Sequence, residues 1–211
     1  MIPSSRDIVL GRIRTSLGRE RHADAGVQSR RTNWTRPAFA ADDVARFIAK
    51  AEASFCTVER VATLGDAGAA IDAMLPARGL TPNVNIAPSL QHVSWPQTWA
   101  TTFGAGRRVE AIAITDATAG IAETGTLVLC SQADRPSGLN FLPDLHICIL
   151  RAEDIVHHLE DVWPKVRALP VWPRAVNFIS APSRTADVAQ IVVRPAHGPK
   201  ALHIVLLGGP S

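Results

Sequence analysis

The sequence is poor in cysteine and aromatic residues and has no long apolar run, and each shortage excludes a class of protein. Its 211 residues include 3 cysteines, too far apart for a C-x-x-C pair or an iron–sulfur cysteine run. No apolar stretch approaches the roughly 20 residues of a transmembrane helix. The H-E-x-x-H and Walker A motifs are also absent. We therefore expect no transmembrane segment, no metal site, no cofactor bound by this chain and a cytoplasmic location.

Positive charge is concentrated at the start of the chain. Residues 1–36 hold eight arginines and three acidic residues, which gives this segment a net charge of +5. The whole chain has a net charge of +3, so the remainder carries about −2. Aromatic residues are scarce there and no nucleic-acid-binding motif accompanies the charge, so we do not expect a nucleic acid partner. Val9, Ile13 and Leu17 recur at helical spacing and predict an amphipathic helix over 5–18. Because a lone helix is marginal in water, we expect it to dock on the rest of the chain, on a second copy or on another protein.

From residue 41 onward, short apolar runs alternate with amphipathic segments. The expected strands are 60–64, 83–88, 109–115, 125–131, 146–150, 175–180 and 202–207. The expected helices are 41–55, 66–75, 152–169 and 183–192, with a short helix or turn over 116–124. This alternation is typical of βαβ units and predicts an α/β fold with a mostly parallel sheet between helices. We divide the chain into a basic helix and linker, 1–36, and one α/β domain, 37–211.

The first segment that could carry function is 115–126, which contains the stretch A-E-T-G-T. Asp116 directly follows an apolar strand, and Gly125 can adopt a positive φ that ends a short helix. Glu123 would then lie in the last helical turn, where the helix dipole disfavours a carboxylate. The residue therefore needs a cation, a ligand or solvent beside it, and the local pattern leaves these alternatives open.

Two further segments follow strands in the same way. In 177–191, a turn and an expected helix start bring Ser183 and Thr185 together with backbone N–H groups, a natural anion site to which Arg184 adds a bidentate cation. The alternative is that Ser183 only caps its helix, with Asp187 completing a variant capping box. In the third segment, 197–203, His197 is either a proton-transfer group or a hydrogen-bonded turn residue.

Ligands of parallel sheets usually bind beyond the carboxyl ends of the strands. We therefore expect the three segments to meet in one crevice at that edge. Glu123 and His197 are the candidates for proton transfer. The candidate ligand-binding residues are Asp116, Thr124, Gly125, Thr126, Ser183, Arg184, Thr185, Asp187 and Gly198.

The motifs A-E-T-G-T, P-S-R-T-A-D and H-G-P, in this order, resemble the LUD (lactate utilization) domain family over about residues 80–207. The resemblance implies a fold similar to the sugar-phosphate isomerase and CoA-transferase group. Family members act with two partners, an iron–sulfur protein and a second cysteine-rich protein, in the oxidation of L-lactate to pyruvate. The sequence departs from the family pattern at Ala181 and Ala189, where glycine and glutamate are usual, so Ala189 argues against an essential role for that position.

The resemblance implies a component of an L-lactate-oxidising complex rather than a complete enzyme. Its ligand would be a small anion such as lactate or a phosphate-bearing compound, and the iron–sulfur clusters would belong to a partner. Two alternatives stay open. One is a stand-alone isomerase or acyl/CoA-type transferase, which rests on fold analogy alone. The other is a non-catalytic module that binds a small anion and takes part in assembly.

Overall fold

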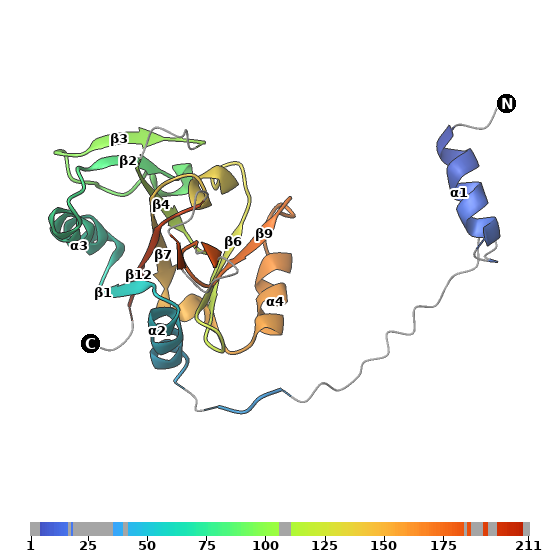
Figure 1. Ribbon diagram of the computed structural model, residues 1–211, viewed down its shortest axis with the longest axis horizontal. Coiled ribbons are helices and arrows are strands. Elements are labelled where there is room, and N and C mark those ends of the chain that lie inside the picture. The colour runs from blue at the N-terminus through green and yellow to red at the C-terminus, as the bar shows by residue number, and fades with distance from the viewer. Residues whose placement is uncertain are drawn as a thin grey trace. The chain divides into compact units, whose positions relative to one another are not determined.

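A computed structural model describes residues 5–16, 18, 36–39, 42–105, 111–183, 185–186, 192–193 and 198–208 of the chain. The chain divides into two units, Met1–Phe39 and Ala40–Ser211. The first contains helix α1 (Ser5–Ser16), which lies within the helix predicted over 5–18, and the second contains the other described helices and strands (Figure 1). Among the described helices, none has the length and hydropathy of a membrane-spanning segment.

The second unit is built on a parallel sheet of six strands, which confirms the predicted fold class. Along the sheet, the order is β1 (Thr57–Val61), β12 (Ala201–Leu207), β7 (Leu145–Arg151), β4 (Ile112–Asp116), β2 (Asn83–Ile86) and β3 (Ala100–Phe103). Each of these strands is parallel to its neighbours. The central strands are apolar at nearly every position because both faces of the sheet are covered.

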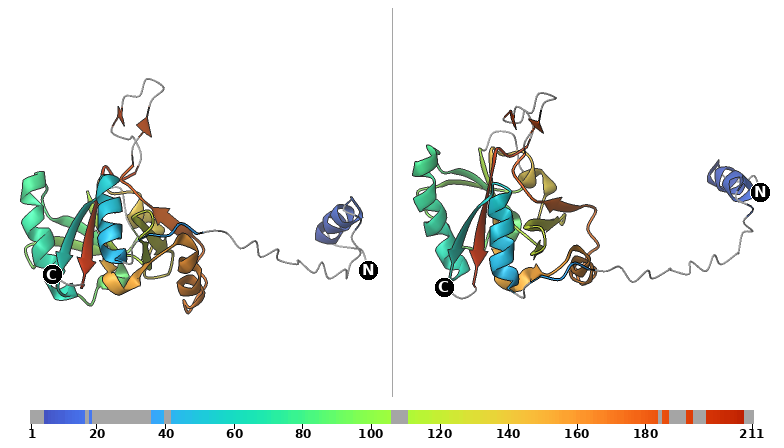
Figure 2. Two further views of the ribbon diagram at one scale, coloured as in Figure 1. Left: turned by 90° about the horizontal axis from the view of Figure 1, so that it is seen from below. Right: turned by 60° about the horizontal axis from the view of Figure 1, so that its bottom comes forward.

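Side chains alternate between two cores on either side of this main sheet. On β7, Ile147 and Ile149 belong to the core that α3 (Ala67–Met74) covers. The intervening Cys148 and Leu150 belong to the core that α2 (Asp43–Ala53) covers from the other side. The two helices lie on opposite sides of the strands in Figure 2. The N-cap of α2 is Asp42, as the sequence predicts, and its carboxylate accepts a hydrogen bond from the Ala45 N–H at 2.9 Å.

A second, four-stranded sheet lies on the α2 side of the main sheet and was not predicted. Its order is β8 (Ile155–Val156), β5 (Ala119–Ile121), β6 (Thr126–Cys130) and β9 (Val176–Ile179). The β5–β6 and β6–β9 pairs are antiparallel, and β5 and β8 are parallel. One face packs on the main sheet through Leu127 and Leu129, and the other packs on α4 (Val162–Arg167), which Figure 1 shows beside β9.

The sequence predicted a short helix or turn over 116–124. The helix is wrong, because residues 119–130 form the β5–β6 hairpin, whereas a turn is present at 122–125 between its two strands. The small residues of D-A-T-A-G-I-A suggested a helix, but here they let backbones approach closely. A Cβ on Gly120 would lie 2.7 Å from the side chain of Leu150 and 3.0 Å from that of Phe47. Tertiary packing therefore overrides a weak local preference.

Two other expected helices are also corrected. Over 152–169, the chain forms a 3₁₀ turn (Ala152–Asp154), strand β8, a second 3₁₀ turn (Leu159–Asp161) and then α4. Pro164 lies in the first turn of α4, where helices do not use the backbone N–H that proline lacks. It therefore does not kink a longer helix. Within 183–192, strand β10 (Thr185–Ala186) is antiparallel to β11 (Val192–Val193), which contradicts a helix at those positions. The strand β3 lies in a region that the sequence left unassigned.

Gly125 gives the first testable prediction. Its φ is +68°, and a Cβ would lie 2.4 Å from the backbone nitrogen of Ala51 in α2. We expect Gly125→Ala to lower the free energy of unfolding by more than about 2 kcal/mol, because left-handed strain adds to a backbone clash. Gly79→Ala is the matched control: its φ is +64° but no atom lies within 4 Å, so it should cost only about 1 kcal/mol. Equal losses in urea unfolding would show that the contact with α2 is unimportant.

Candidate functional site

A cavity with a volume of about 930 Å³ lies at the amino ends of β7 and β12. Its walls come from the segments before these strands, from their first residues and from β9 with the turn after it. The lining residues are Asn140, Phe141, Leu142, Asp144, His146, Phe178, Ile179, Ser180, Ala181, Pro182, Ser183, Gly198, Pro199, Lys200 and Leu202. We call this space the main cavity. It lies at the edge opposite to the one expected.

The chain itself covers the carboxyl ends of the central strands β4 and β7, which explains why the cavity is not at that edge. After β4, the Ala117 N–H donates to the Ile149 carbonyl and the Thr118 N–H donates to the Val128 carbonyl, both at 2.8 Å. The chain thus passes directly from the main sheet into the second sheet. Strand β7 leads in the same way, through one 3₁₀ turn, into β8. At these two strands the chain's own backbone therefore crosses the edge where ligands of parallel sheets usually bind.

Two of the predicted segments meet at the main cavity. The Ser183 N–H donates to the Pro199 carbonyl at 2.9 Å, which joins the P-S-R-T-A-D and H-G-P motifs. Gly198 has a φ of +90°, and a Cβ there would lie 3.0 Å from the Cβ of Ser183. Glycine is therefore required for this approach. The hydrogen bond also engages the Ser183 amide, which we had expected to bind an anion.

The A-E-T-G-T motif reaches the same cavity through a chain of hydroxyl groups. Thr124 Oγ1 lies 2.6 Å from Thr126 Oγ1, which lies 2.7 Å from Ser180 Oγ in the cavity wall. Thr126 is 4% exposed. Three hydroxyls joined by two hydrogen bonds retain one proton to donate. When the chain of bonds runs from Thr124 to Ser180, Ser180 presents that proton to the cavity.

Glu123 points toward a histidine. It lies in the turn between β5 and β6, and its Oε2 is 3.1 Å from Nδ1 of His158, whose side chain is 8% exposed. Its backbone N–H donates to the His157 carbonyl at 3.1 Å. Among the described residues, Glu123 does not line the main cavity. The sequence predicted that Glu123 needs a cation, a ligand or solvent beside it, and His158 is the candidate for that partner. Catalysis by Glu123 stays a prediction.

Several predicted site residues lie outside the described residues or are described only in part. Arg184, Asp187 and His197 are outside them, and for Thr185 only the backbone is described, in β10. The anion clamp and the proton-transfer role of His197 therefore stay predictions. Their neighbours Ser183 and Gly198 place both segments beside the main cavity.

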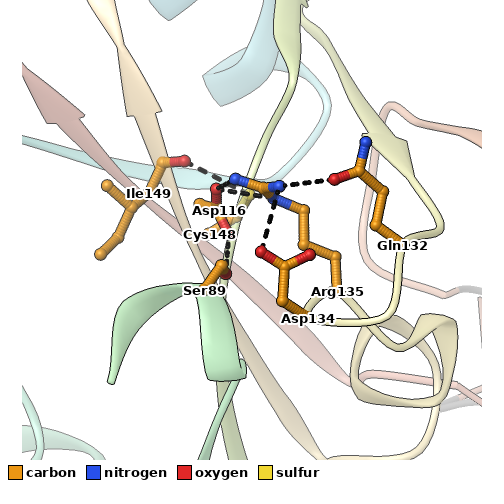
Figure 3. Close-up of polar contacts among 7 residues, drawn as sticks. All are labelled: Ser89, Asp116, Gln132, Asp134, Arg135, Cys148 and Ile149. Atoms are coloured by element: carbon orange, nitrogen blue, oxygen red, sulfur yellow. Dashed lines mark hydrogen bonds and ion pairs between the residues drawn. The ribbon is translucent and has the colours of Figure 1, made fainter. Parts of the chain in front are cut away.

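Asp116 lies at the other edge of the sheet, in a cluster of its own (Figure 3). Its Oδ2 accepts hydrogen bonds from Nε and Nη2 of Arg135 at 2.8 and 2.6 Å, and its Oδ1 accepts one from the Ser89 hydroxyl at 2.5 Å. The side chain of Asp116 is 19% exposed and that of Arg135 is 30% exposed. Gln132 holds the guanidinium from another side at 3.0 Å. The structure thus separates Asp116 from the cavity-lining candidates and satisfies its charge internally.

His146 lines the main cavity and was not predicted as a site residue. It is 1% exposed, and its Nε2 lies 2.7 Å from the Thr115 hydroxyl. Burial lowers the pKa of His146 from 6.5 to about 4, so the ring is neutral near pH 7. The signal in the sequence was a single histidine inside the apolar strand H-I-C-I-L. That pattern also fits a core histidine, so it could not identify a cavity residue.

The three cysteines are poor nucleophiles or metal ligands as they stand. Cys56, Cys130 and Cys148 are free and buried. Burial raises the pKa of all three thiols, that of Cys56 to about 11. Within the described part of the chain, no group of three or more histidine, cysteine, aspartate or glutamate side chains could hold a metal ion.

The Asp116–Arg135 pair gives a stability prediction. We expect Arg135→Met to lower the free energy of unfolding by about 2 kcal/mol, because it leaves a largely buried carboxylate without its main partner. The control is Lys200→Met, which removes the partner of Asp144 in a pair whose side chains are 47% and 57% exposed. That change should cost less than about 1 kcal/mol. Similar losses for both variants in urea unfolding would contradict a structural role for the Asp116 cluster.

His146 gives a prediction about pH. Its pKa in the folded protein, about 4, is below the ordinary 6.5, so the unfolded chain binds the proton first as pH falls. Stability from this residue is therefore complete above pH 6.5 and is lost down to about pH 4, by at most about 3 kcal/mol. We expect His146→Gln to flatten the pH dependence of unfolding between pH 6.5 and 4.5. An unchanged slope would show that His146 is not buried in its neutral form.

Residues 110–207 match the family model of the LUD domain. Lactate utilization protein C of Deinococcus radiodurans is 32% identical over 102 residues, 48% of each chain. Lactate utilization protein C of Geobacillus thermodenitrificans is 30% identical over 135 residues, 56% of this chain and 55% of that protein. The chain spans about half the length of the curated relatives it matches.

The fold is also similar to a crystal structure, that of a DUF162 family protein from Deinococcus radiodurans. The TM-score is 0.60 at 20% sequence identity, over 82% of this chain and 100% of that one. At this identity the likeness concerns the fold, and it supports the α/β architecture described above. The resemblance to the LUD domain family that the sequence motifs predicted is thus confirmed over residues 110–207.

Proposed function

We propose that the chain is a subunit of a lactate utilization system that supports the oxidation of L-lactate to pyruvate. One observation carries the proposal: the segment that matches the LUD domain, residues 110–207, includes every described residue lining the main cavity. Two relatives at 30–32% identity bear the name lactate utilization protein C. The region of similarity is thus also the region with room for a ligand.

In this proposal, the main cavity binds the hydroxy acid. Ser180 can donate its hydroxyl proton to a carboxylate, since Thr126 holds its oxygen from behind at 2.7 Å. His146 contributes a neutral ring whose Nε2 is paired with the Thr115 hydroxyl, which leaves Nδ1 to donate or to accept one hydrogen bond. Lys200 adds a cation, although Asp144 already pairs with it at 3.0 Å. The described polar groups therefore favour a ligand with one negative charge and neighbouring hydroxyl or carbonyl oxygens.

Oxidation of L-lactate to pyruvate removes two electrons and two protons, so an electron acceptor is required. We assign the redox centres to partner proteins, one of them an iron–sulfur protein, as the family resemblance implies. The role proposed for this chain is to bind and orient a ligand. Proton transfer by Glu123 or His197 belongs to the same proposal, and Glu123→Gln tests the charge at nearly constant shape.

The test is lactate-dependent dye reduction by the partner proteins, co-expressed with and without this chain. We expect reduction to fall to background when the chain is omitted. Ser180→Ala and Thr126→Val should each lower it roughly tenfold, the effect of losing about one hydrogen bond to the ligand or its support. Thr102→Val, on the exposed edge strand β3, is the matched control and should have no effect.

Two outcomes would contradict the proposal. Dye reduction that is identical without the chain would remove it from lactate oxidation. Turnover of lactate by the isolated chain would instead support a complete enzyme. Far-ultraviolet circular dichroism and melting temperature, measured on each variant, separate loss of the site from loss of the fold.

A further inference from the structure

The main cavity is much larger than lactate. L-Lactate has six non-hydrogen atoms, so even at the roughly 30 Å³ that each liquid water occupies it would need only about 180 Å³. The cavity, at about 930 Å³, is about five times that size, near the top of the roughly 300–1,000 Å³ typical of sites for larger organic ligands. A ligand of the size of lactate would leave most of the cavity walls in contact with water.

Part of the cavity wall is apolar and exposed to solvent. Phe141, Leu142 and Phe178 line it and are 44%, 45% and 38% exposed. Apolar side chains of this size are normally buried, and a group of them around one cavity marks a binding surface. Phe178 is held in place, because its ring packs edge-on against Trp163 at a centroid distance of 6.3 Å. This wall is therefore suited to an apolar group of the ligand.

Among the described lining residues, the charges of the polar wall balance. The charges of Lys200 and Asp144 compensate each other, and His146 and Ser180 contribute hydrogen bonds without charge near pH 7. Such a wall suits a single carboxylate with an adjacent oxygen better than a highly charged phosphate, which requires several cations. The two walls together therefore select an amphipathic monoanion.

We propose that the main cavity binds 2-hydroxy or 2-oxo carboxylates that carry an apolar chain or ring, with L-lactate as the shortest member of the class. This inference rests on the proposed function for the carboxylate head of the ligand. It adds that the apolar chain or ring of the ligand, its apolar arm, also binds in the cavity. The head group binds among Ser180, His146 and Lys200, and the arm covers Phe141, Leu142 and Phe178.

Isothermal titration calorimetry of the full chain tests the inference directly. The probes are L-lactate, (S)-2-hydroxybutanoate, (S)-2-hydroxyhexanoate and (S)-3-phenyllactate, with hexanoate as the acid that lacks the hydroxyl group. We expect Kd to fall about threefold to fourfold for each added methylene group, as burial of that group predicts. Hexanoate should bind at least about fivefold more weakly than (S)-2-hydroxyhexanoate, because it leaves a polar group of the site unpaired.

Matched variants locate the effect. Phe141→Ala should reduce the gain from (S)-2-hydroxybutanoate to (S)-2-hydroxyhexanoate at least about threefold. Phe103→Ala removes a phenylalanine of similar exposure, 47%, on β3 and should leave the gain unchanged. Phe141 and Phe103 are both exposed, so both variants should fold, which their melting temperatures check.

The inference is overturned if Kd is independent of chain length, or if Phe103→Ala reduces the chain-length effect as much as Phe141→Ala does. Its failure is distinguishable from that of the proposed function. If dye reduction requires the chain while binding shows no chain-length dependence, only the apolar arm is wrong. If binding follows chain length while dye reduction is unaffected by omission of the chain, the site exists and the role in lactate oxidation is wrong.

Discussion

The placement of the second sheet on the main sheet, and with it the position of the main cavity, depends on the close packing of the β5–β6 hairpin against helix α2 and strand β7. Gly120 and Gly125 have no room for a side chain at these contacts, which lets the second sheet lie directly on the main sheet. This packing covers the carboxyl ends of β4 and β7 and leaves space for a cavity at the amino ends of β7 and β12. The same hairpin carries Thr124 and Thr126, so the contact that builds the fold also brings hydroxyl groups to the cavity wall.

Charge in the interior is handled differently at the two edges of the main sheet. At the carboxyl end of β4, Asp116 and Arg135 form a paired, hydrogen-bonded cluster, so neither charge is left for a ligand. At the amino end of β7, His146 is kept neutral by burial and faces the cavity. A buried charge needs a partner that stays in place, whereas a buried neutral donor and acceptor can exchange partners at modest cost. The first arrangement suits stability and the second suits binding.

The sequence predicted the strands and helices whose pattern is set by burial on a regular period. Helix α2, helix α3 and strands β2, β7 and β12 lie where apolar spacing and Asp42 indicated. The prediction failed at β5, where a run of small residues suggested a helix. Only the contact with Leu150, which is distant in the sequence, shows why residue 120 is a glycine. The order of motifs brought Ser183 and Gly198 together correctly, but it placed Asp116 with them. The local sequence does not show that Arg135 and Ser89 already donate hydrogen bonds to the carboxylate of Asp116.

The position of the cavity changes the meaning of the motif A-E-T-G-T. The sequence suggested Glu123 as a candidate for proton transfer and Thr124, Gly125 and Thr126 as candidates for ligand binding. In the structure the carboxylate is directed to His158, while the two threonines connect to Ser180. A hydroxyl chain of this kind supplies hydrogen bonds without adding charge, so the ligand's own charge sets the electrostatics of the complex. The motif is therefore best understood as a support for a polar wall, and chemistry at Glu123 would require a group that approaches from the His158 side.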